Sequence, residues 1–599
     1  MHKALAVALL ATVATLPMSP VFADEHAAEA TENPASAAYK TIREDIWEWR
    51  LDNSPGLAMS VGDRRGDGKL GDWSVDGHKR SVSEAMAFFA KLDQIDQSQL
   101  PAELQVDYEV LHQSLGDIIA ASKHAHDWYQ IFTNRGGWFN QLASLPHGSP
   151  FFTGADYESY IGRLEAYAKV NQDAIARTRI AIEKGLTHAC GPMQGFGDRM
   201  QSLVHLEAES SPYWKPFETR PATIDEAEWD ALKTRAKTAL EGSVFPELQR
   251  FADFYIQEYE PECRTGTPGV LATPGGAEFY EYRVRSFTTT AMTADEVHNL
   301  GLSEVARIRT EMEEVAATAG FNTREAFIDH LRTDPQYYMT DGQEYLRFTQ
   351  ALAKEIDFWM PKLFGKLPRQ PYTVLPIPAA QAPGNTTAYY EPGSLDTGQA
   401  GIYRLNLTEL DQRPLWELPA LGVHEAVPGH HHQIALQREL DLHPLRANGT
   451  FFTAFVEGWA LYSERLGIEM GIYDTPAKEM GRLSYEMWRA TRLVVDTGIH
   501  AKGWSKQRAV DYMLDNTALS PANIDAEVNR YITWPGQALA YKVGELKIRE
   551  LRELAEAHLG ADFDLREFHD TVLENGSVPL SVLEAHVKRW IDVRVAGRD

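Results

Sequence analysis

The segment Leu421-Gly-Val-His-Glu-Ala-Val-Pro-Gly-His-His-His-Gln433 decides how the rest of the chain is interpreted. It contains four histidines and a glutamate, interrupted by a Pro-Gly pair. Zinc hydrolases commonly carry H-E-x-x-H on one helix, with both histidines as ligands and the glutamate as general base. Here His424 and Glu425 match the first two positions, but Pro428 stands where the second histidine is expected. The segment is therefore either a variant zinc site or a coincidental likeness.

Helix geometry limits which later histidine can share a metal with His424. On an ideal helix His431 lies on nearly the same side but about 10 Å further along the axis, and His430 lies about 120° around it. Residues 428–429 change this geometry. Proline lacks the N–H that would bond to the carbonyl of His424, and glycine permits unusual backbone conformations. A kink here would bring His430 into the second ligand position, and His431 remains the alternative.

A third ligand is expected from another helix, and Glu457 is the candidate. It lies in a strongly apolar segment, 453–464, where burying a carboxylate is costly unless it binds a cation or is paired. Glu464 lies on the same helical face. We expect Glu457 to bind the metal and Glu464 to orient a ligand histidine, although the two roles could be exchanged.

These motifs resemble those of a bacterial family known as domain of unknown function 885. That family shows His-Glu-x-x-Pro-Gly-His, as at 424–430 here, and Glu-Gly-Trp-Ala, as at 457–460. Other matching segments are Trp47-Glu-Trp-Arg, Gly62-Asp-Arg-Arg, Tyr389-Tyr-x-Pro, Val494-Val-Asp-Thr-Gly-Ile-His500 and Arg530-Tyr-Ile-x-Trp-Pro-Gly-Gln-Ala-Leu-x-Tyr541-Lys. The resemblance implies a distant branch of the zinc peptidases whose third ligand is glutamate. Its nearest shapes are thimet-oligopeptidase-like and carboxypeptidase-Taq-like, with a deep cleft between helical halves.

Hydrolysis of an amide builds an oxyanion, which a nearby hydrogen-bond donor stabilises. Within the resembling segments, Tyr541, Tyr531 and His500 are the predicted catalytic residues besides the general base. Asp496 precedes His500 by about one helical turn, so its carboxylate is expected to orient that imidazole.

Three further residues are predicted to bind substrate. Arg530 would hold a peptide carboxylate, which favours carboxypeptidase or dipeptidase action. Tyr389 and Tyr390 follow a Pro/Gly-rich stretch that we expect to pair with an extended peptide, as an added strand pairs with a sheet edge.

Composition and charge exclude some classes of partner. The chain has 599 residues and a formal net charge of -27, which argues against nucleic acid and anionic membrane surfaces. Residues 1–23 have the pattern of a secretory signal peptide, and 24–37 are expected to form a disordered leader. The sequence thus predicts a periplasmic or secreted protein without stable membrane insertion. The two cysteines, Cys190 and Cys263, are free to form a disulfide, but sequence alone leaves the pairing open.

Most of the chain has helical periodicity, so the predicted class is mainly α. We expect an N-terminal helical region, 38–275, and a helical metallopeptidase-like region, 276–599, with the boundary at a stretch rich in Gly, Pro and Thr. Residues 401–407 alternate like a strand. A small sheet is therefore predicted just before the histidine helix, which is expected to span 415–440.

The sequence as a whole predicts an exported zinc-dependent hydrolase that cleaves short peptides. One Zn²⁺ per chain would be held by His424, His430 and Glu457, with Glu425 as general base. One alternative is a zinc amidohydrolase or esterase with a non-peptide substrate. Another is a catalytically silent peptide-binding protein, against which the intact Glu425 argues. The sequence does not determine substrate length, end preference, side-chain specificity or oligomeric state.

Overall fold

The computed structural model describes residues 33–597, apart from 149–150, 205–206, 379–381, 383–384 and 394–397. Helices dominate this part of the chain, so the predicted mainly α class is confirmed. The predicted signal peptide lies outside the described residues, as does the leader before residue 33. Helix α1 begins at Pro34, inside the predicted leader, because the Asn33 side chain accepts a hydrogen bond from the Ala35 N–H and caps the first turn.

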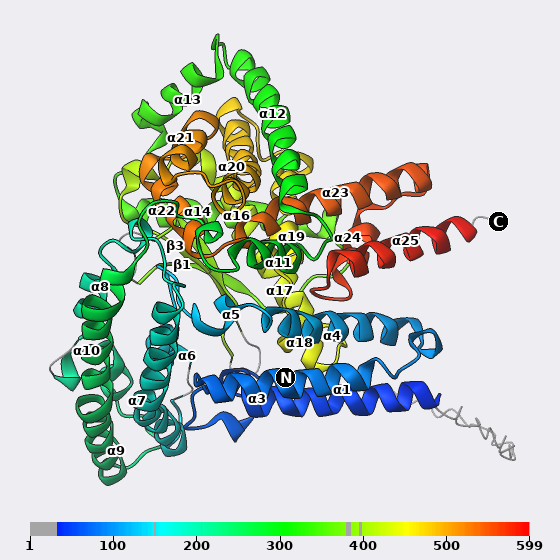
Figure 1. Cartoon of the computed structure of the whole chain (residues 1–599). Helices are drawn as coiled ribbons and strands as arrows, with labels where there is room; N and C mark the ends of the chain where they lie inside the picture. Colours follow the sequence, from blue (N-terminus) through cyan, green and yellow to red (C-terminus); the bar gives the residue numbers. More distant parts are fainter. Residues whose placement is uncertain are drawn as a thin grey trace, which may run out of the picture.

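The N-terminal helices form two groups (Figure 1). The first group packs around an apolar core of its own and consists of α1 (Pro34–Asn53), α2 (Pro55–Ser60), α3 (Val75–Leu92), α4 (Ala102–Ala121) and α5 (Ala125–Tyr129). The second consists of α6 (Phe139–Gly148), α7 (Gly154–Glu183), α8 (Phe196–Ser202), α9 (Glu226–Ala239) and α10 (Phe245–Phe254). A disulfide joins Cys190, which lies between α7 and α8, to Cys263, which follows α10.

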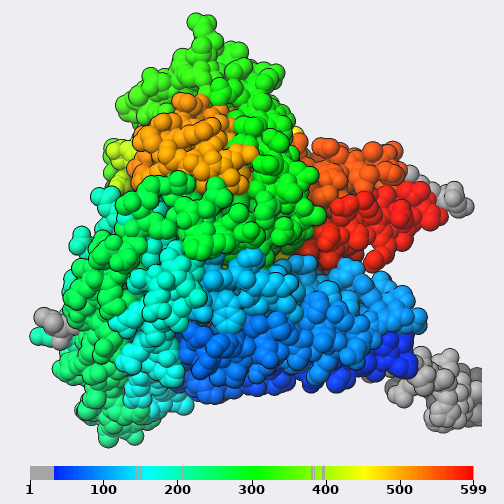
Figure 2. All heavy atoms as spheres, viewed as in Figure 1, coloured from blue at the N-terminus to red at the C-terminus, as the bar shows by residue number. Residues whose placement is uncertain are grey.

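The remaining helices surround the largest apolar core. They are α11 (Gly276–Thr288), α12 (Ala294–Thr318), α13 (Arg324–Thr333), α14 (Gly342–Asp357), α15 (Met360–Leu363), α16 (Leu418–Glu425), α17 (His430–Glu439), α18 (Pro444–Gly449), α19 (Thr453–Met470), α20 (Pro476–His500), α21 (Lys506–Asn516), α22 (Pro521–Thr533), α23 (Ala540–Leu559), α24 (Leu565–Leu573) and α25 (Leu580–Ala596). In the space-filling view this part lies against the N-terminal helices along a broad contact (Figure 2).

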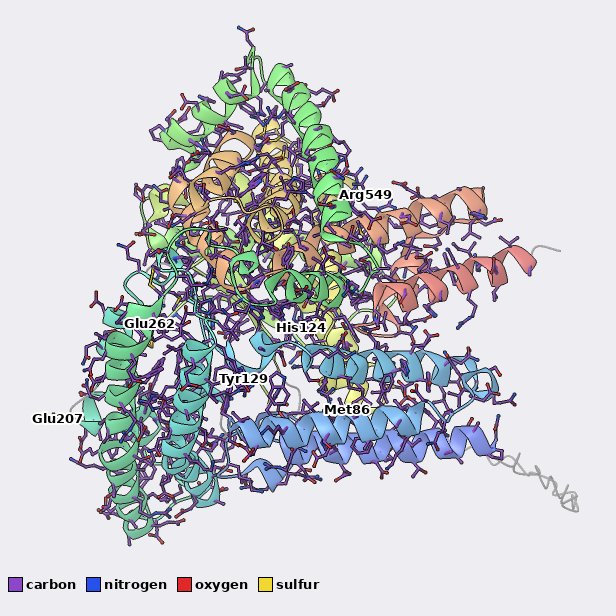
Figure 3. All side chains as sticks on the ribbon, in the orientation of Figure 1. Met86, His124, Tyr129, Glu207, Glu262 and Arg549 are labelled. Carbon is purple, nitrogen blue, oxygen red and sulfur yellow. A yellow bond between two sulfur atoms is a disulfide. The ribbon has the colours of Figure 1, made fainter. Side chains whose placement is uncertain are left out.

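The two regions share contacts across the predicted boundary. Val106 and Val110 of α4 belong to the same apolar core as the C-terminal helices. His124, labelled in Figure 3, stacks on Tyr282 of α11 with ring centroids 5.0 Å apart. The N-terminal helices therefore support the core that carries the candidate site.

The sheet has three strands in the order β1-β3-β2, and it precedes α16 as predicted. The strands are β1 (Tyr372–Pro376), β2 (Ala388–Glu391) and β3 (Gly401–Leu405). β1 pairs with β3 in parallel, and β2 pairs with β3 in antiparallel orientation. The predicted substrate-binding residues Tyr389 and Tyr390 lie in β2. Since β2 is paired on one side only, it is an edge strand beside α16.

The helix predicted over 415–440 is broken into α16 and α17. Residues 426–429 connect the two helices, and the Gly429 N–H donates to the carbonyl of Val423 at 3.0 Å. A Cβ atom added at Gly429 would lie 2.0 Å from the carbonyl oxygen of His424, so a side chain does not fit there. The Pro-Gly pair thus ends one helix and begins the next at His430.

Candidate metal centre

Three side chains from three helices converge at this break. His424 lies at the end of α16, His430 opens α17, and Glu457 lies near the start of α19. The Glu457 Oε2 atom is 3.8 Å from His424 Nε2 and 3.3 Å from His430 Nε2. One possible ligand atom of each residue lies within 4.8 Å of the others. The structure therefore brings together the three residues that the sequence predicts as metal ligands.

The second layer of contacts orients His424. Its Nδ1 atom lies 2.8 Å from Oε1 of Glu464, the residue expected to orient a ligand histidine. Arg489 on α20 holds the same carboxylate oxygen at 3.2 Å. With Nδ1–H donating to Glu464, the lone pair of His424 is on Nε2, on the side of Glu457. A carboxylate in this position is a common partner of a metal-binding histidine.

His431, the alternative ligand, is held elsewhere. Its Nε2 atom lies 3.0 Å from the carbonyl oxygen of Gln370, and its Nδ1 atom lies 2.9 Å from the hydroxyl of Tyr390. Both ring nitrogens are therefore occupied by contacts away from Glu457. The geometry favours His430 as the second ligand. Because α17 begins at His430, this residue faces Glu457 and His431 does not.

Burial and neighbouring charges set the protonation of the triad. Burial lowers the pKa of His424 well below its usual value, and the Arg489 guanidinium lowers it further. Burial raises the pKa of Glu457, but the opposing charge and hydrogen bond of His430 outweigh this and bring it to about 2. A neutral imidazole and an ionised carboxylate are the forms that bind a divalent cation.

Glu425 is the last residue of α16 and lies next to the first candidate ligand. It is buried, and burial raises the pKa of its carboxyl group to about 7. Its side chain lines the same cleft as the triad. A carboxylate with this pKa can both accept and return a proton near neutral pH.

A close crossing of α19 and α23 brings Tyr541 to the triad. A Cβ atom added at Gly458 would lie 2.5 Å from the Cα atom of Gly544, so the two backbones touch. This crossing places the Tyr541 side chain near Glu457, and both residues line the same cleft. On the other side, the indole N–H of Trp459 donates to the carbonyl of Pro428 at 2.8 Å and holds the break between α16 and α17.

The triad lies in a cleft of about 370 Å³, within the size range of small-ligand sites. Eight of the ten residues predicted for the site line it: His424, Glu425, His430, Glu457, Tyr541, Arg530, Tyr389 and Tyr390. The edge strand β2 contributes part of one wall. The cleft thus joins the predicted metal ligands, the predicted base and the predicted substrate-binding residues in one space.

Two predicted catalytic residues do not line this cleft. His500 accepts a hydrogen bond from the Val270 N–H at 3.1 Å, and its other ring nitrogen lies 2.9 Å from the carbonyl of Tyr531. Asp496, expected to orient it, instead accepts from the hydroxyl of Tyr280. The side chain of Tyr531 is fully buried. The structure does not bring the side chains of His500 and Tyr531 into the cleft: the ring of His500 contacts backbone groups, and the Tyr531 hydroxyl donates to Glu527 at 3.0 Å.

Four charged residues of the cleft were not predicted from the sequence: Arg135, Arg489, Arg492 and Glu527. Arg489 and Arg492 lie in an apolar stretch of α20, where buried charge is as costly as it is around Glu457. That signal was present in the sequence. The other two come from α22 and from a loop before α6, and no local pattern connects them to the histidines.

The chain matches the sequence pattern described as bacterial protein of unknown function (DUF885) over residues 55–587. It belongs to this family. No curated protein is similar enough in sequence to count as a relative of this DUF885 chain.

Two solved structures resemble this DUF885 chain. A candidate lipoprotein from Colwellia psychrerythraea is 28% identical, with a TM-score of 0.84, and the match covers 93% of this chain and 99% of that one. A candidate lipoprotein of unknown function from Shewanella oneidensis is 20% identical, with a TM-score of 0.64, and the match covers 92% and 99%. The second likeness shows the fold alone. In the described part of the chain, no helix has the length and apolar character that crossing a bilayer requires.

Proposed function

We propose that this chain is an exported, zinc-dependent hydrolase that cleaves the peptide bonds of short peptides. The observation that carries the proposal is the convergence of two imidazoles and one carboxylate beside a buried glutamate at the helix break. Two histidines and a glutamate, with a further carboxylate on one histidine, form a common donor set of catalytic zinc sites. The proposal also places the chain near the glutamate-ligand zinc peptidases.

The donor set fits a divalent cation on its own chemistry. Glu457 Oε2 is buried and faces the two candidate ligand nitrogens, His430 Nε2 at 3.3 Å and His424 Nε2 at 3.8 Å. An ionised oxygen in this state is costly unless a cation binds it. When bound by His424, His430 and Glu457, zinc would supply Lewis-acid polarisation of the scissile carbonyl and of the attacking water.

The chain's own residues then have distinct roles. Glu425 accepts the proton of the attacking water and returns it to the leaving amine, a cycle suited to a carboxyl group with a pKa of about 7. Tyr541 lies beside Glu457, so its hydroxyl is close to the place where the oxyanion forms. Glu425 thus takes up the proton of the attacking water, while Tyr541 stabilises the oxyanion that the attack creates.

The edge strand gives the substrate a place to bind. β2 is paired on one side only, and its residues Ala388, Tyr389 and Tyr390 line the cleft. An extended peptide has backbone donors and acceptors that can pair with such an edge. A peptide is therefore favoured over a compact non-peptide amide.

Export has two independent supports. The first is the signal-peptide pattern of residues 1–23. The second is the Cys190–Cys263 disulfide, since such bonds persist in oxidising compartments outside the cytosol. The related structure from Colwellia is described as a candidate lipoprotein, which is consistent with an exported family.

Mass spectrometry of a short-peptide library, digested with and without a zinc chelator, tests the proposal. We expect cleavage that the chelator abolishes and added zinc restores, and elemental analysis should give about one zinc per chain. Protein purified without chelator that contains no metal and cleaves nothing would overturn the proposal. Cleavage of acyl-amide substrates but not of peptides would identify a non-peptide amidohydrolase instead.

A further inference from the structure

Beside the candidate metal centre, one wall of the cleft carries more positive charge than its acids can balance. Glu527 on α22 is buried, and three guanidinium groups share it. Its Oε2 atom accepts from Arg492 at 2.9 Å and from Arg530 at 3.0 Å, and its Oε1 atom accepts from Arg135 at 3.1 Å. Among the described residues, Glu527 is the only acid that forms an ion pair with any of these three arginines.

Two of these guanidinium groups keep unused donors inside the cleft. Arg492 Nη1 and Arg530 Nε are buried and have no hydrogen-bond partner among the described residues. Both side chains are more than nine-tenths buried, and both line the cleft that contains the metal triad. Buried donors without partners are rare and costly, so they indicate a group that is missing from the site.

The guanidinium groups are also held in place before any ligand binds. Arg492 stacks over the ring of Tyr541 at 4.3 Å and over the ring of Trp488 at 4.4 Å. Arg530 donates a second hydrogen bond to Gln537 at 2.7 Å. A planar guanidinium fixed in this way presents its N–H groups to a carboxylate with little further loss of entropy.

Tyr541 connects this wall to the metal triad. Its ring lies under the Arg492 guanidinium, and its side chain lies near Glu457 in the same cleft. A substrate group bound by the arginines would therefore lie close to the scissile bond, which is expected at the metal triad. In a peptide, a carboxylate that near the scissile bond belongs either to the C-terminus or to an adjacent acidic side chain.

We propose that Arg492 and Arg530, with Arg135 at the outer edge, form a subsite for a carboxylate of the substrate next to the scissile bond. This inference rests on the proposed function for its meaning, because it assigns the substrate class of the same cleft. The free-acid end of a short peptide is the first source, which makes the enzyme act from the C-terminus. An aspartate or glutamate side chain is the second source.

Binding measurements test the subsite without requiring turnover. The chain carrying Glu425→Gln, which protects the probes from hydrolysis, is titrated with N-acetyl-alanyl-alanine, with its C-terminal amide, and with N-acetyl-alanyl-aspartic acid α-amide. Trp488 contacts Arg492, so tryptophan fluorescence can follow binding, with calorimetry as a second readout. We expect the free acid to bind about 10- to 100-fold more tightly than the neutral amide. Tight binding of the aspartyl amide would assign the subsite to an acidic side chain.

Substitutions decide whether the arginines cause this preference. Arg530→Gln should bring the ratio of acid to amide affinity close to one. Arg549→Gln is the matched control, since Arg549 is partly buried on α23, pairs with Glu545 at 3.4 Å and does not line the cleft (Figure 3). If Arg530→Gln does not fold, Arg135→Gln removes the most exposed of the three cations and should lower the ratio by about threefold.

Equal binding of acid and amide by the chain with its arginines intact would overturn the subsite, as would an unchanged ratio in Arg530→Gln. The proposed function fails by a different result. If no peptide is hydrolysed but the free acid is still preferred, the cleft binds carboxylates without cleaving them. If peptides are hydrolysed without regard to the free acid, the hydrolase stands and the subsite is wrong.

Discussion

Two buried clusters of charged side chains, each with members on α20, differ in how many of their hydrogen-bond donors have a partner. In the first, the fully buried ammonium group of Lys542 lies 2.8 Å from Glu486, 2.8 Å from Glu545 and 3.1 Å from Glu304. In the second, three arginines of the cleft share Glu527. All three donors of the lysine are used, whereas two buried guanidinium nitrogens have no partner among the described residues.

This difference separates a structural role from a binding role. The lysine cluster is closed, because its acids are also paired with the arginines at 307 and 482. It can accept no further ion without breaking contacts. The cleft cluster is open toward a cavity that also contains the metal triad. We therefore expect substitutions in the cleft to reduce function at nearly constant stability, and substitutions in the lysine cluster to reduce stability.

The largest expected effect is on catalysis, from Glu425→Gln. This substitution keeps the shape of the side chain but removes the proton acceptor, so kcat should fall about 10²- to 10⁴-fold. Zinc content and the denaturation midpoint should change little, because the residue is not a ligand. Steady-state kinetics, elemental analysis and urea unfolding measure the three quantities. A variant with full activity would contradict the assigned base.

The next largest effect is on stability, from Lys542→Met. Removing the ammonium group leaves three buried carboxylates without their shared cation, which should cost about 3–5 kcal/mol in free energy of unfolding. Urea denaturation measures this loss. Lys547→Met on the same helix is the control, since that side chain is 22% exposed and should cost under about 1 kcal/mol. Equal losses for the two variants would mean that the closed cluster does not stabilise the core.

A smaller effect is expected from Glu464→Gln, which weakens the support of His424. Loss of this carboxylate should lower zinc affinity about 10- to 100-fold without removing a ligand. Competition with a chromogenic chelator measures the affinity. Glu469→Gln lies on the same helix and pairs with Arg552 away from the triad, so it should leave zinc affinity unchanged. A normal affinity for Glu464→Gln would argue against the orienting role.

The smallest expected effect is the pH dependence of stability that comes from Glu417, a buried acid outside both clusters. Burial raises its pKa from 4.5 to about 8, so the folded chain holds this proton more tightly than the unfolded chain. The resulting stabilisation is complete below about pH 4.5 and is lost as pH rises through about 8. Glu417→Gln should flatten the fall in apparent Tm between pH 5.5 and 8. An identical fall in both proteins would exclude Glu417 as its source.

The sequence predicted the site best where the chemistry is local. The His-Glu pair, the Pro-Gly interruption and the buried acids of α19 are all close in sequence, and the structure brings His424, His430 and Glu457 together. The backbone at residues 426–429 was less predictable. A Pro-Gly pair is compatible both with a kink in one helix and with the end of one helix and the start of another. Only the contacts of His431 distinguish the two candidate ligands.

Residues that reach the site from distant segments were predicted poorly. Tyr531 and His500 occur in family-like motifs, but neither side chain lines the cleft: His500 contacts the Tyr531 carbonyl, and the Tyr531 hydroxyl donates to Glu527. Arg135 and Glu527 are far apart in sequence and meet only because α22 lies over the N-terminal region. A motif indicates that a polar residue is required at a position. The packing of the helices determines whether that residue reaches the cleft or stabilises the fold.

The crossing of α19 and α23 has a consequence for how this protein can change by mutation. An added Cβ atom at Gly544 would lie 1.9 Å from the carbonyl oxygen of Ala454, and one at Gly458 would meet the facing backbone. Any larger residue at either position must push the helices apart and carry Tyr541 away from Glu457. The evolutionary constraint on this cleft therefore extends to two residues that have no chemistry of their own, and a single added methyl group is the smallest inherited change that would disable it.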